Sequence, residues 1–449
     1  MGVDVIVIGG GLSGISTAVD LASRGISVLV LEQRPHLGGR TYSFIDESTG
    51  DAVDNGQHLM MGCYHATRWL LTAIGSDRLA TLQPNLHIEF LHPDRGQSSL
   101  HCPARPPPLH LLAGLMTLRN LSLPDRLKLL RVGFEIRKNP REVEPKIASL
   151  TVHQWLDALG QSAESKRYLW DIIAIGSLND DPKDVSALLF YRVLRSAFLG
   201  SREDSSLLVS RVGLTELFVQ PCIDFVRSRG GKIMLNCGVD ESIFDGNRLR
   251  GVRGSDGQVR EARAFVSAVP WYATSPLFSN AAGRQGWNMN GHLQPSPIVT
   301  INLWFDRIVM DQEFVALLDS RVHWVFNKSK MYGSTASSRQ YLSLVISGAA
   351  SLVAMDSRDL VKVALEDLSR VFPRMQGVEL VHSLVVKEKR ATFSPRPGVE
   401  EHRPSSKTQV ENLFLAGDWT DTGYPATIEG AVLSGRKAAA GIAEMLAEK

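Results

Sequence analysis

Polar and titratable side chains are concentrated in the stretch VDNGQHLMMGCYH, residues 53–65. An apolar run follows directly after Asp54, Asn55, Gln57 and His58. This mixture could form a metal site, an ordinary polar loop in which Asp54 caps a turn, or the wall of a pocket where an apolar molecule meets a reactive cofactor. The two histidines have no carboxylate or cysteine at ligand spacing, so a metal site is disfavoured. The other two interpretations remain open from this stretch alone.

The N-terminal residues have the pattern of a βαβ unit. Residues 4–8 are typical of a strand buried on both faces, and residues 26–32 form a second such run. Between them a G-x-G-x-x-G pattern opens a predicted helix, so that the backbone can approach a pyrophosphate. The acidic residue about 20 positions later can accept hydrogen bonds from the adenosine ribose. The predicted dinucleotide contacts are Gly9, Gly10, Gly11, Leu12, Ser13, Gly14, Glu32, Gln33 and Arg34.

A second glycine pair followed by Arg40 resembles an extension found in flavoproteins of the amine oxidase and carotenoid desaturase superfamily. Near the C-terminus, Gly417-Asp418 and a helix that starts near Thr427 are similar to the segment of that superfamily that binds the flavin. There the helix N-terminus stabilises negative charge on a reduced flavin. The resemblance implies FAD. The further contacts that it implies are Gly38, Gly39, Arg40, Gly56, Val239 (near the adenine), Gly417, Asp418, Thr427, Ile428 and Ala431.

Two segments resemble a narrower branch, the hydroxysqualene dehydroxylases of hopanoid and squalene biosynthesis. They are DNGQH (54–58) with the apolar run after it, and TGYPATIEGAVLSG (422–435). The resemblance implies reductive removal of an allylic hydroxyl from a long apolar isoprenoid, with hydride from reduced FAD and loss of water. The expected catalytic residues are His58 as acid, since its reference pKa of about 6.5 suits proton donation, and Asn55 and Gln57 to orient the hydroxyl or bond the flavin. Support of the flavin edge by His58 is an equal alternative, and Tyr424 is expected to border the pocket.

Three other functions stay open. A carotenoid desaturase or isomerase would act on a polyene and would share the superfamily motifs. An FAD amine oxidase would carry a lysine near the flavin, but residues 296–305 contain none. A non-catalytic, FAD-stabilised partner would not need the polar residues at 54–58. The sequence has no second dinucleotide motif, so the electron donor has no recognisable site, which favours a flavin that cycles in place.

Composition limits the partners. The chain of 449 residues has a net charge of +2, which gives no reason to expect nucleic acid. Its four cysteines form no C-x-x-C pair and are expected to be reduced, as in a cytosolic protein. Neither a secretory signal nor a membrane-spanning run is recognisable. We therefore expect a cytoplasmic protein, free or peripheral on the inner face of the membrane, and no metal.

The motifs predict an α/β protein with a Rossmann-type FAD-binding domain, a parallel sheet, and an inserted α+β substrate domain. The FAD-binding domain is expected from residues 1–80, 206–270 and 405–449, and the substrate domain from residues 81–205 and 271–404. Within the first insert, residues 101–141 combine prolines, an apolar run and basic residues. This segment is interpreted either as a lid with a solvated basic face or as a surface that contacts an anionic membrane.

Overall fold

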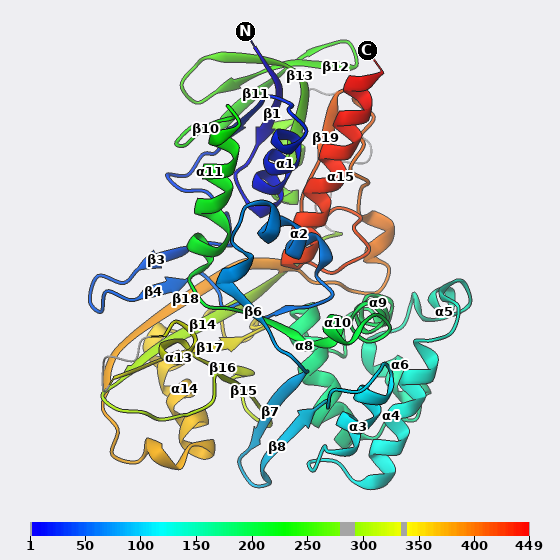
Figure 1. Ribbon diagram of the computed structural model, residues 1–449, viewed down its shortest axis with the longest axis vertical. Coiled ribbons are helices and arrows are strands. Elements are labelled where there is room, and N and C mark those ends of the chain that lie inside the picture. Colours follow the sequence, from blue (N-terminus) through cyan, green and yellow to red (C-terminus); the bar gives the residue numbers. More distant parts are fainter. Residues whose placement is uncertain (1, 279–291, 334–338, 449) are drawn as a thin grey trace.

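The structure is a computed structural model that describes residues 2–278, 292–333 and 339–448. Residues 279–291 and 334–338, both within the predicted substrate domain, lie outside the described residues. Two large sheets and a group of helices make up the described chain (Figure 1). Both termini lie at the end of the molecule that holds the first sheet.

The first sheet has the order β10-β2-β1-β13-β12-β11, with β19 paired to β13. Strands β10, β2, β1, β13 and β19 run parallel, and β11 and β12 form an antiparallel extension. Its strands are β1 (Val3–Ile8), β2 (Val28–Leu31), β10 (Lys232–Met234), β11 (Val239–Asp245), β12 (Arg248–Gly254), β13 (Val259–Ser267) and β19 (Leu413–Leu415). The apolar β1 and β2 runs are buried on both faces, because helices cover one face of the sheet and side chains of β12 and its neighbours cover the other. These helices are α1 (Leu12–Ser23), α11 (Gln220–Ser228) and α15 (Ile428–Ala447).

Helices α1 and α15 approach closely because Gly435 has no side chain. A Cβ at Gly435 would lie 2.4 Å from the Ser13 carbonyl oxygen. The Thr17 hydroxyl donates to the Gly435 carbonyl at 3.2 Å. The N-terminal and C-terminal segments are thereby joined beside the first sheet, and the predicted α/β fold with a parallel sheet is confirmed.

The second sheet has the order β18-β14-β17-β16-β15-β7-β8. Its strands are β7 (His87–His92), β8 (Gly96–His101), β14 (Pro295–Phe305), β15 (Phe314–Leu317), β16 (Trp324–Asn327), β17 (Gln340–Ile346) and β18 (Leu380–Phe393). Helix α14 (Ser357–Val371) packs on it through Leu360, Ala364 and Leu368. β7 and β15 form its parallel pair, and the other pairs are antiparallel.

A helical region lies beside the second sheet (Figure 1). Its helices are α3 (Leu109–Met116), α4 (Leu123–Glu135), α5 (Pro140–Ile147), α6 (Val152–Ala158), α7 (Ala163–Ser165), α8 (Asp171–Leu178), α9 (Ala187–Phe198) and α10 (Arg202–Ser205). Side-chain oxygens of Ser122, Asn139 and Thr151 cap the N-termini of α4, α5 and α6, which explains where these helices begin. Trp155 and Phe190 pack edge to face at 6.3 Å between ring centroids in the core of this region.

Shorter elements connect these layers. β3 (Ser43–Ile45) and β4 (Ala52–Asp54) form a hairpin, and β9 (Leu207–Ser210) pairs with both β5 (Met60–Met61) and β6 (Ala80–Leu82). The remaining helices are α2 (His65–Ala73), α12 (Trp271–Leu277) and α13 (Lys328–Met331). The 3-10 and π segments are Asp77–Leu79, Lys166–Trp170, Thr215–Val219, Pro373–Met375 and Val399–His402. None of the described helices has the length and apolar composition needed to cross a bilayer.

Candidate functional site

The turn from β1 to α1 forms one wall of a cavity of about 530 Å³. Gly9 adopts a φ of +101°, and a Cβ at Gly14 would lie 2.0 Å from the Gly9 carbonyl oxygen, so both positions require glycine. Gly11 is the N-cap of α1, and a Cβ there would meet nothing within 4 Å. The helix N-terminus therefore faces open space, where its unpaired N–H groups can receive a phosphate.

The Glu32 carboxylate is held next to the glycine turn. Its Oε2 accepts a hydrogen bond from the Gly10 N–H at 2.7 Å, and its Oε1 accepts one from the Arg34 N–H at 2.8 Å. These bonds fix the carboxylate at the end of β2, which is where a dinucleotide ribose binds in this kind of unit.

The second glycine pair lies directly against the first glycine motif. The Gly38 N–H donates to the Gly10 carbonyl at 2.8 Å, and a Cβ at Gly39 would lie 3.0 Å from the Gly11 Cα. Gly38 and Gly39 have φ angles of +103° and +62°. The two motifs, separate in the sequence, therefore form one continuous backbone surface at the cavity wall.

Arg40 joins this surface to the C-terminal segment. Its Nη2 donates to both carboxylate oxygens of Asp418 at 2.9 Å, and its Nη1 donates to the Ala391 carbonyl. Burial disfavours the charged guanidinium, but the Asp418 carboxylate outweighs it and raises the pKa of Arg40. Arg40 and Asp418 thus form a cation–carboxylate pair at the cavity wall.

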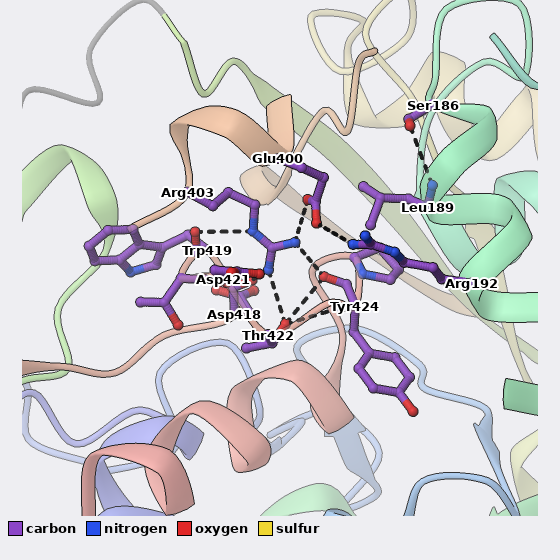
Figure 2. A network of polar contacts seen from close by, with 12 residues as sticks. Ser186, Leu189, Arg192, Glu400, Arg403, Asp418, Trp419, Asp421, Thr422 and Tyr424 are labelled. Carbon is purple, nitrogen blue, oxygen red and sulfur yellow. Dashed lines mark hydrogen bonds and ion pairs between the residues drawn. The ribbon is translucent and has the colours of Figure 1, made fainter. Parts of the chain in front are cut away.

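Arg403 holds the loop that carries Asp418 (Figure 2). Its side chain has no exposed surface. The guanidinium pairs with Glu400 at 2.6 Å, and Glu400 also pairs with Arg192 of α9 at 3.1 Å. The other acceptors of the Arg403 guanidinium are the carbonyls of Asp418, Trp419, Thr420 and Tyr424 and the Thr422 hydroxyl. The sequence pattern did not reveal this residue, because no motif surrounds it.

The polar loop at 54–58 lies on the cavity wall beside Arg40. The Asn55 Nδ2 donates to the Arg40 carbonyl at 3.3 Å and to Glu388 at 3.5 Å. The Gln57 Nε2 donates to the His58 carbonyl at 3.1 Å. The structure therefore brings Asn55, Gln57 and His58 together at one part of the cavity.

His58 is half-buried, and its side chain borders the cavity. Burial lowers the pKa of His58 to about 4; the nearby Asp54 carboxylate opposes this shift, and the charges of Arg40 and Lys328 add to it. The imidazole is therefore neutral at pH 7 in this structure, which differs from the expectation that a pKa near its reference value would supply a ready acid. Its roles as acid or as flavin support remain predictions.

Asp54 takes part in a buried ion pair that the sequence did not suggest. Its Oδ2 lies 2.7 Å from the Lys328 Nζ, and the two side chains are 4% and 1% exposed. Oδ1 accepts from the Ser43 hydroxyl at 2.6 Å and from the Leu214 N–H at 3.0 Å. The Lys328 ammonium holds the pKa of Asp54 below its usual range, against the effect of burial. Lys328 lies far along the chain in α13, so local spacing could not pair it with Asp54.

Glu429, in the first turn of α15, fixes the end of the segment that follows His58. Its buried carboxylate accepts from the N–H groups of Ala66 and Thr67, both at 2.9 Å, and from the Thr67 hydroxyl at 2.7 Å. Burial raises the pKa of Glu429, and these donors oppose the shift. The N-terminus of α2 is therefore attached to the helix whose own N-terminus borders the cavity.

Most of the predicted cofactor residues border this one cavity. Those that do are Gly9, Gly11, Leu12, Ser13, Glu32, Gln33, Arg34, Gly38, Gly39, Arg40, Gly56, Val239, Gly417, Asp418, Thr427, Ile428 and Ala431. Gly10 and Gly14 do not border it. A Cβ at Gly10 would lie 2.2 Å from the Leu37 side chain, and Gly14 packs against Gly9. Glycine is therefore needed at both positions for the close packing of the turn.

Beyond His58 the same cavity becomes apolar. It is lined there by side chains of β7, β8, α8, α9, β16 and their neighbours, among them Leu86, Ile88, Leu100, Ile172, Ile173, Val193, Leu194, Phe198, Trp324 and Phe326. Tyr424 also borders it and donates to the Ser196 hydroxyl of α9 at 3.3 Å. Burial raises the pKa of the bordering Cys63 thiol to about 12, so that it is not a thiolate. The cavity therefore combines a polar cradle with an apolar compartment.

The sequence matches the family described as flavin containing amine oxidoreductase over residues 12–443. The chain belongs to this family. It is 28% identical over 441 residues to a hydroxysqualene dehydroxylase of Rhodopseudomonas palustris, covering 97% of each chain. It is 26% identical over 468 residues to a 15-cis-phytoene desaturase of Synechococcus elongatus, covering 98% of this chain and 95% of that one. The fold is similar to that of cyclohexylamine oxidase from Brevibacterium oxydans, with a TM-score of 0.70 at 20% identity and all of both chains covered.

FAD, the cofactor of this flavin family, fits the residues present. The open space at Gly11, the fixed Glu32 carboxylate, and the Arg40–Asp418 pair provide groups for a pyrophosphate, a ribose and a ribityl chain. The chain is thus an FAD-dependent oxidoreductase of the amine oxidoreductase family. Across the described residues, no group of three or more His, Cys, Asp or Glu side chains is placed to hold a metal ion.

Proposed function

We propose that this FAD-dependent oxidoreductase removes the allylic hydroxyl of hydroxysqualene to give squalene. The observation that carries the proposal is that one cavity is lined both by the polar residues Asn55, Gln57 and His58 and by a set of apolar side chains. The similarity to a hydroxysqualene dehydroxylase over 97% of each chain supports it. The substrate is a thirty-carbon isoprenoid alcohol of the kind that such a compartment suits, because burial of apolar carbon drives its binding.

The proposed reaction replaces one C–O bond with one C–H bond and releases water. Reduced FAD, when bound, supplies the hydride. The Asn55 amide binds the hydroxyl next to that position, and a proton must reach the leaving oxygen because hydroxide leaves poorly. The apolar side chains around the carbon chain exclude water, which would otherwise trap an allylic cation. The electron donor that recharges the flavin is a separate reductant.

Product analysis tests this function against a polyene reaction, which the similarity to a phytoene desaturase supports as the second candidate. The purified holoprotein would be incubated in detergent with hydroxysqualene or phytoene, with the flavin either oxidised or kept reduced by dithionite. We expect squalene from hydroxysqualene with reduced flavin only, and unchanged phytoene in both states. Desaturated products from phytoene with oxidised flavin, together with unchanged hydroxysqualene, would contradict the proposal.

The pH dependence of the reaction tests the proposed role of His58 as the acid. Because the pKa of His58 is lowered to about 4, only a small fraction is protonated at pH 7, and this fraction grows as the pH falls. We expect the rate of squalene formation from the reduced holoprotein to rise about tenfold per pH unit between pH 7 and pH 5. His58→Gln should be slow and lack this dependence. A wild-type rate that is flat over this interval would show that another group supplies the proton.

We also propose that the surface of α3 and α4 contacts an anionic membrane, from which the substrate would enter. These helices expose apolar side chains at Leu109, Leu112, Met116, Leu123, Leu127 and Phe134. Basic residues in and near them are Arg119, Arg126, Lys128, Arg131, Arg137, Lys138 and Arg141. Together they supply apolar area for insertion and positive charge for anionic headgroups. We call these residues the α3–α4 surface.

Sedimentation with vesicles tests the α3–α4 surface. Leu123 and Phe134 are 56% and 66% exposed, so glutamate at both positions should not disturb the core. We expect Leu123→Glu/Phe134→Glu to weaken binding to vesicles with anionic lipid by at least about tenfold, since two apolar contacts are lost and two negative charges added. The control is Ile45→Glu, because Ile45 is 63% exposed but lies in β3, away from these helices. Equal binding of the wild type and the double variant would contradict the proposal.

A further inference from the structure

Lys328 is a fully buried ammonium next to the polar loop at 54–58. Its Nζ lies 2.7 Å from the Asp54 Oδ2 and 2.5 Å from the Gln57 Oε1, and it also hydrogen bonds to the Tyr332 hydroxyl. An ammonium has three N–H donors and no acceptor, so these three oxygens use all of its hydrogen-bonding capacity. A buried charge persists only when it is satisfied in this way.

Asp54 does not need Gln57 to complete its own bonding. Its carboxylate accepts from Lys328, from the Tyr332 hydroxyl at 2.7 Å, from the Ser43 hydroxyl and from the Leu214 N–H. The ion pair is therefore complete within the wall of the cavity. The bond from Lys328 to Gln57 extends from that pair toward the cavity, because Gln57 borders it and Lys328 lies behind.

This bond sets the direction of the Gln57 amide. Because an ammonium can only donate, the amide oxygen of Gln57 must face Lys328 and its NH₂ group must point the other way. One N–H of that group reaches the His58 carbonyl at 3.1 Å, and the second remains for a molecule bound in the cavity. The positive charge of Lys328 also acts on the neighbouring His58, because it contributes to the lowered pKa of that imidazole.

We propose that Lys328 is a positioning residue that holds Gln57 with an amide N–H directed at an acceptor atom of the bound flavin ring. Lys328 belongs neither to the dinucleotide motifs nor to the polar loop at 54–58, so neither indicates a role for it. The inference depends on FAD binding and is independent of the identity of the substrate. An N–H donor at the flavin stabilises the reduced, more electron-rich ring, so that loss of this donor should make the midpoint potential more negative.

The test uses the FAD-bound protein without any substrate, and measures the visible absorption spectrum and the midpoint potential of the flavin. The first variant is Asp54→Asn/Lys328→Met, which removes both charges and leaves neither unpaired. The second is Gln57→Leu, and the third combines all three changes. We expect the first two to shift the potential in the negative direction by similar amounts, and the third to add little, because both changes break one chain of hydrogen bonds.

Two results would overturn the inference. If the flavin spectrum and midpoint potential of Asp54→Asn/Lys328→Met equal those of the wild type, Lys328 only neutralises Asp54. Shifts that add in the combined variant would mean that Lys328 acts on the flavin without Gln57. If the variants that lack Lys328 fail to bind FAD, Gln57→Leu alone serves instead, because it keeps the Asp54–Lys328 pair and removes the N–H donor without adding a charge. We expect it to shift the potential in the negative direction, and an unchanged potential would contradict the inference.

Discussion

Gly11→Asp is expected to abolish FAD binding without destabilising the FAD-free protein. Gly11 is the N-cap of α1 with φ −66°, a conformation open to any residue, and its Cβ would meet nothing within 4 Å. Aspartate is a favoured N-cap, so the folded state should gain a few tenths of a kcal/mol. The same carboxylate would lie in the phosphate cradle, where repulsion from one phosphate charge about 4 Å away costs roughly 4 kcal/mol at an effective dielectric constant of about 20. That corresponds to a Kd weakened on the order of 1,000-fold.

Titration with FAD and thermal unfolding of the FAD-free protein measure the two effects separately. Gly11→Asn is the matched control, because asparagine also caps a helix and has nearly the same shape without the charge. It should weaken FAD binding less than aspartate does. Gly133→Ala controls for loss of a glycine elsewhere, since Gly133 in α4 also has open space around its Cβ. Normal FAD binding by Gly11→Asp would contradict the placement of the cofactor at this helix.

Arg403→Met is expected to lower the free energy of unfolding by about 3–5 kcal/mol and to weaken FAD binding. The guanidinium is fully buried, and it bonds Glu400 and the carbonyls of the loop that carries Asp418 (Figure 2). Methionine fills much of the volume but leaves those acceptors without donors. Urea denaturation of the FAD-free protein, followed by FAD titration, measures both effects.

Arg192→Met is the control for Arg403→Met. It removes another arginine of the same network but none of the bonds to the loop that carries Asp418. Arg192 shares Glu400 with Arg403 but its side chain is 29% exposed, and it contacts none of the loop carbonyls that Arg403 bonds. We expect a loss of about 1 kcal/mol and unchanged FAD binding. Arg403→Lys should resemble Arg403→Met, because a lysine cannot reach so many acceptors. Equal effects of the Arg192 and Arg403 changes would contradict the role of Arg403 in shaping the flavin loop.

The FAD cradle could be predicted from the sequence because its parts are local. The glycines at 9–14 and those at 38–39 each act through the backbone geometry of their own turn, and Glu32 directly follows the next strand. The α/β fold follows from the same pattern, since buried parallel strands alternate with the helices that cover them. Gly10 shows the limit of this reasoning. It was predicted to contact the dinucleotide, but it does not border the cavity, and glycine is needed there because a Cβ would meet Leu37.

The groups that shape the cavity from outside these motifs could not be predicted. Lys328 and Glu429 bond partners that are remote in the sequence, and Arg403 bonds the carbonyls of a later loop. No motif or periodicity of the sequence identifies such pairs. The lowered pKa of His58 has the same origin, because burial and the charges of Arg40 and Lys328 exist only in the folded chain. The residue types at 54–58 therefore indicated a site, whereas their protonation and orientation depend on tertiary contacts.

An anaerobic single turnover tests the central proposal most directly. The bound flavin would be reduced with one equivalent of dithionite and mixed with hydroxysqualene in detergent, and the absorbance of oxidised flavin would be followed while the lipids are extracted. The dehydroxylase function predicts that the flavin is reoxidised and that one squalene forms for each flavin. A flavin that stays reduced, with the alcohol recovered unchanged, would contradict it.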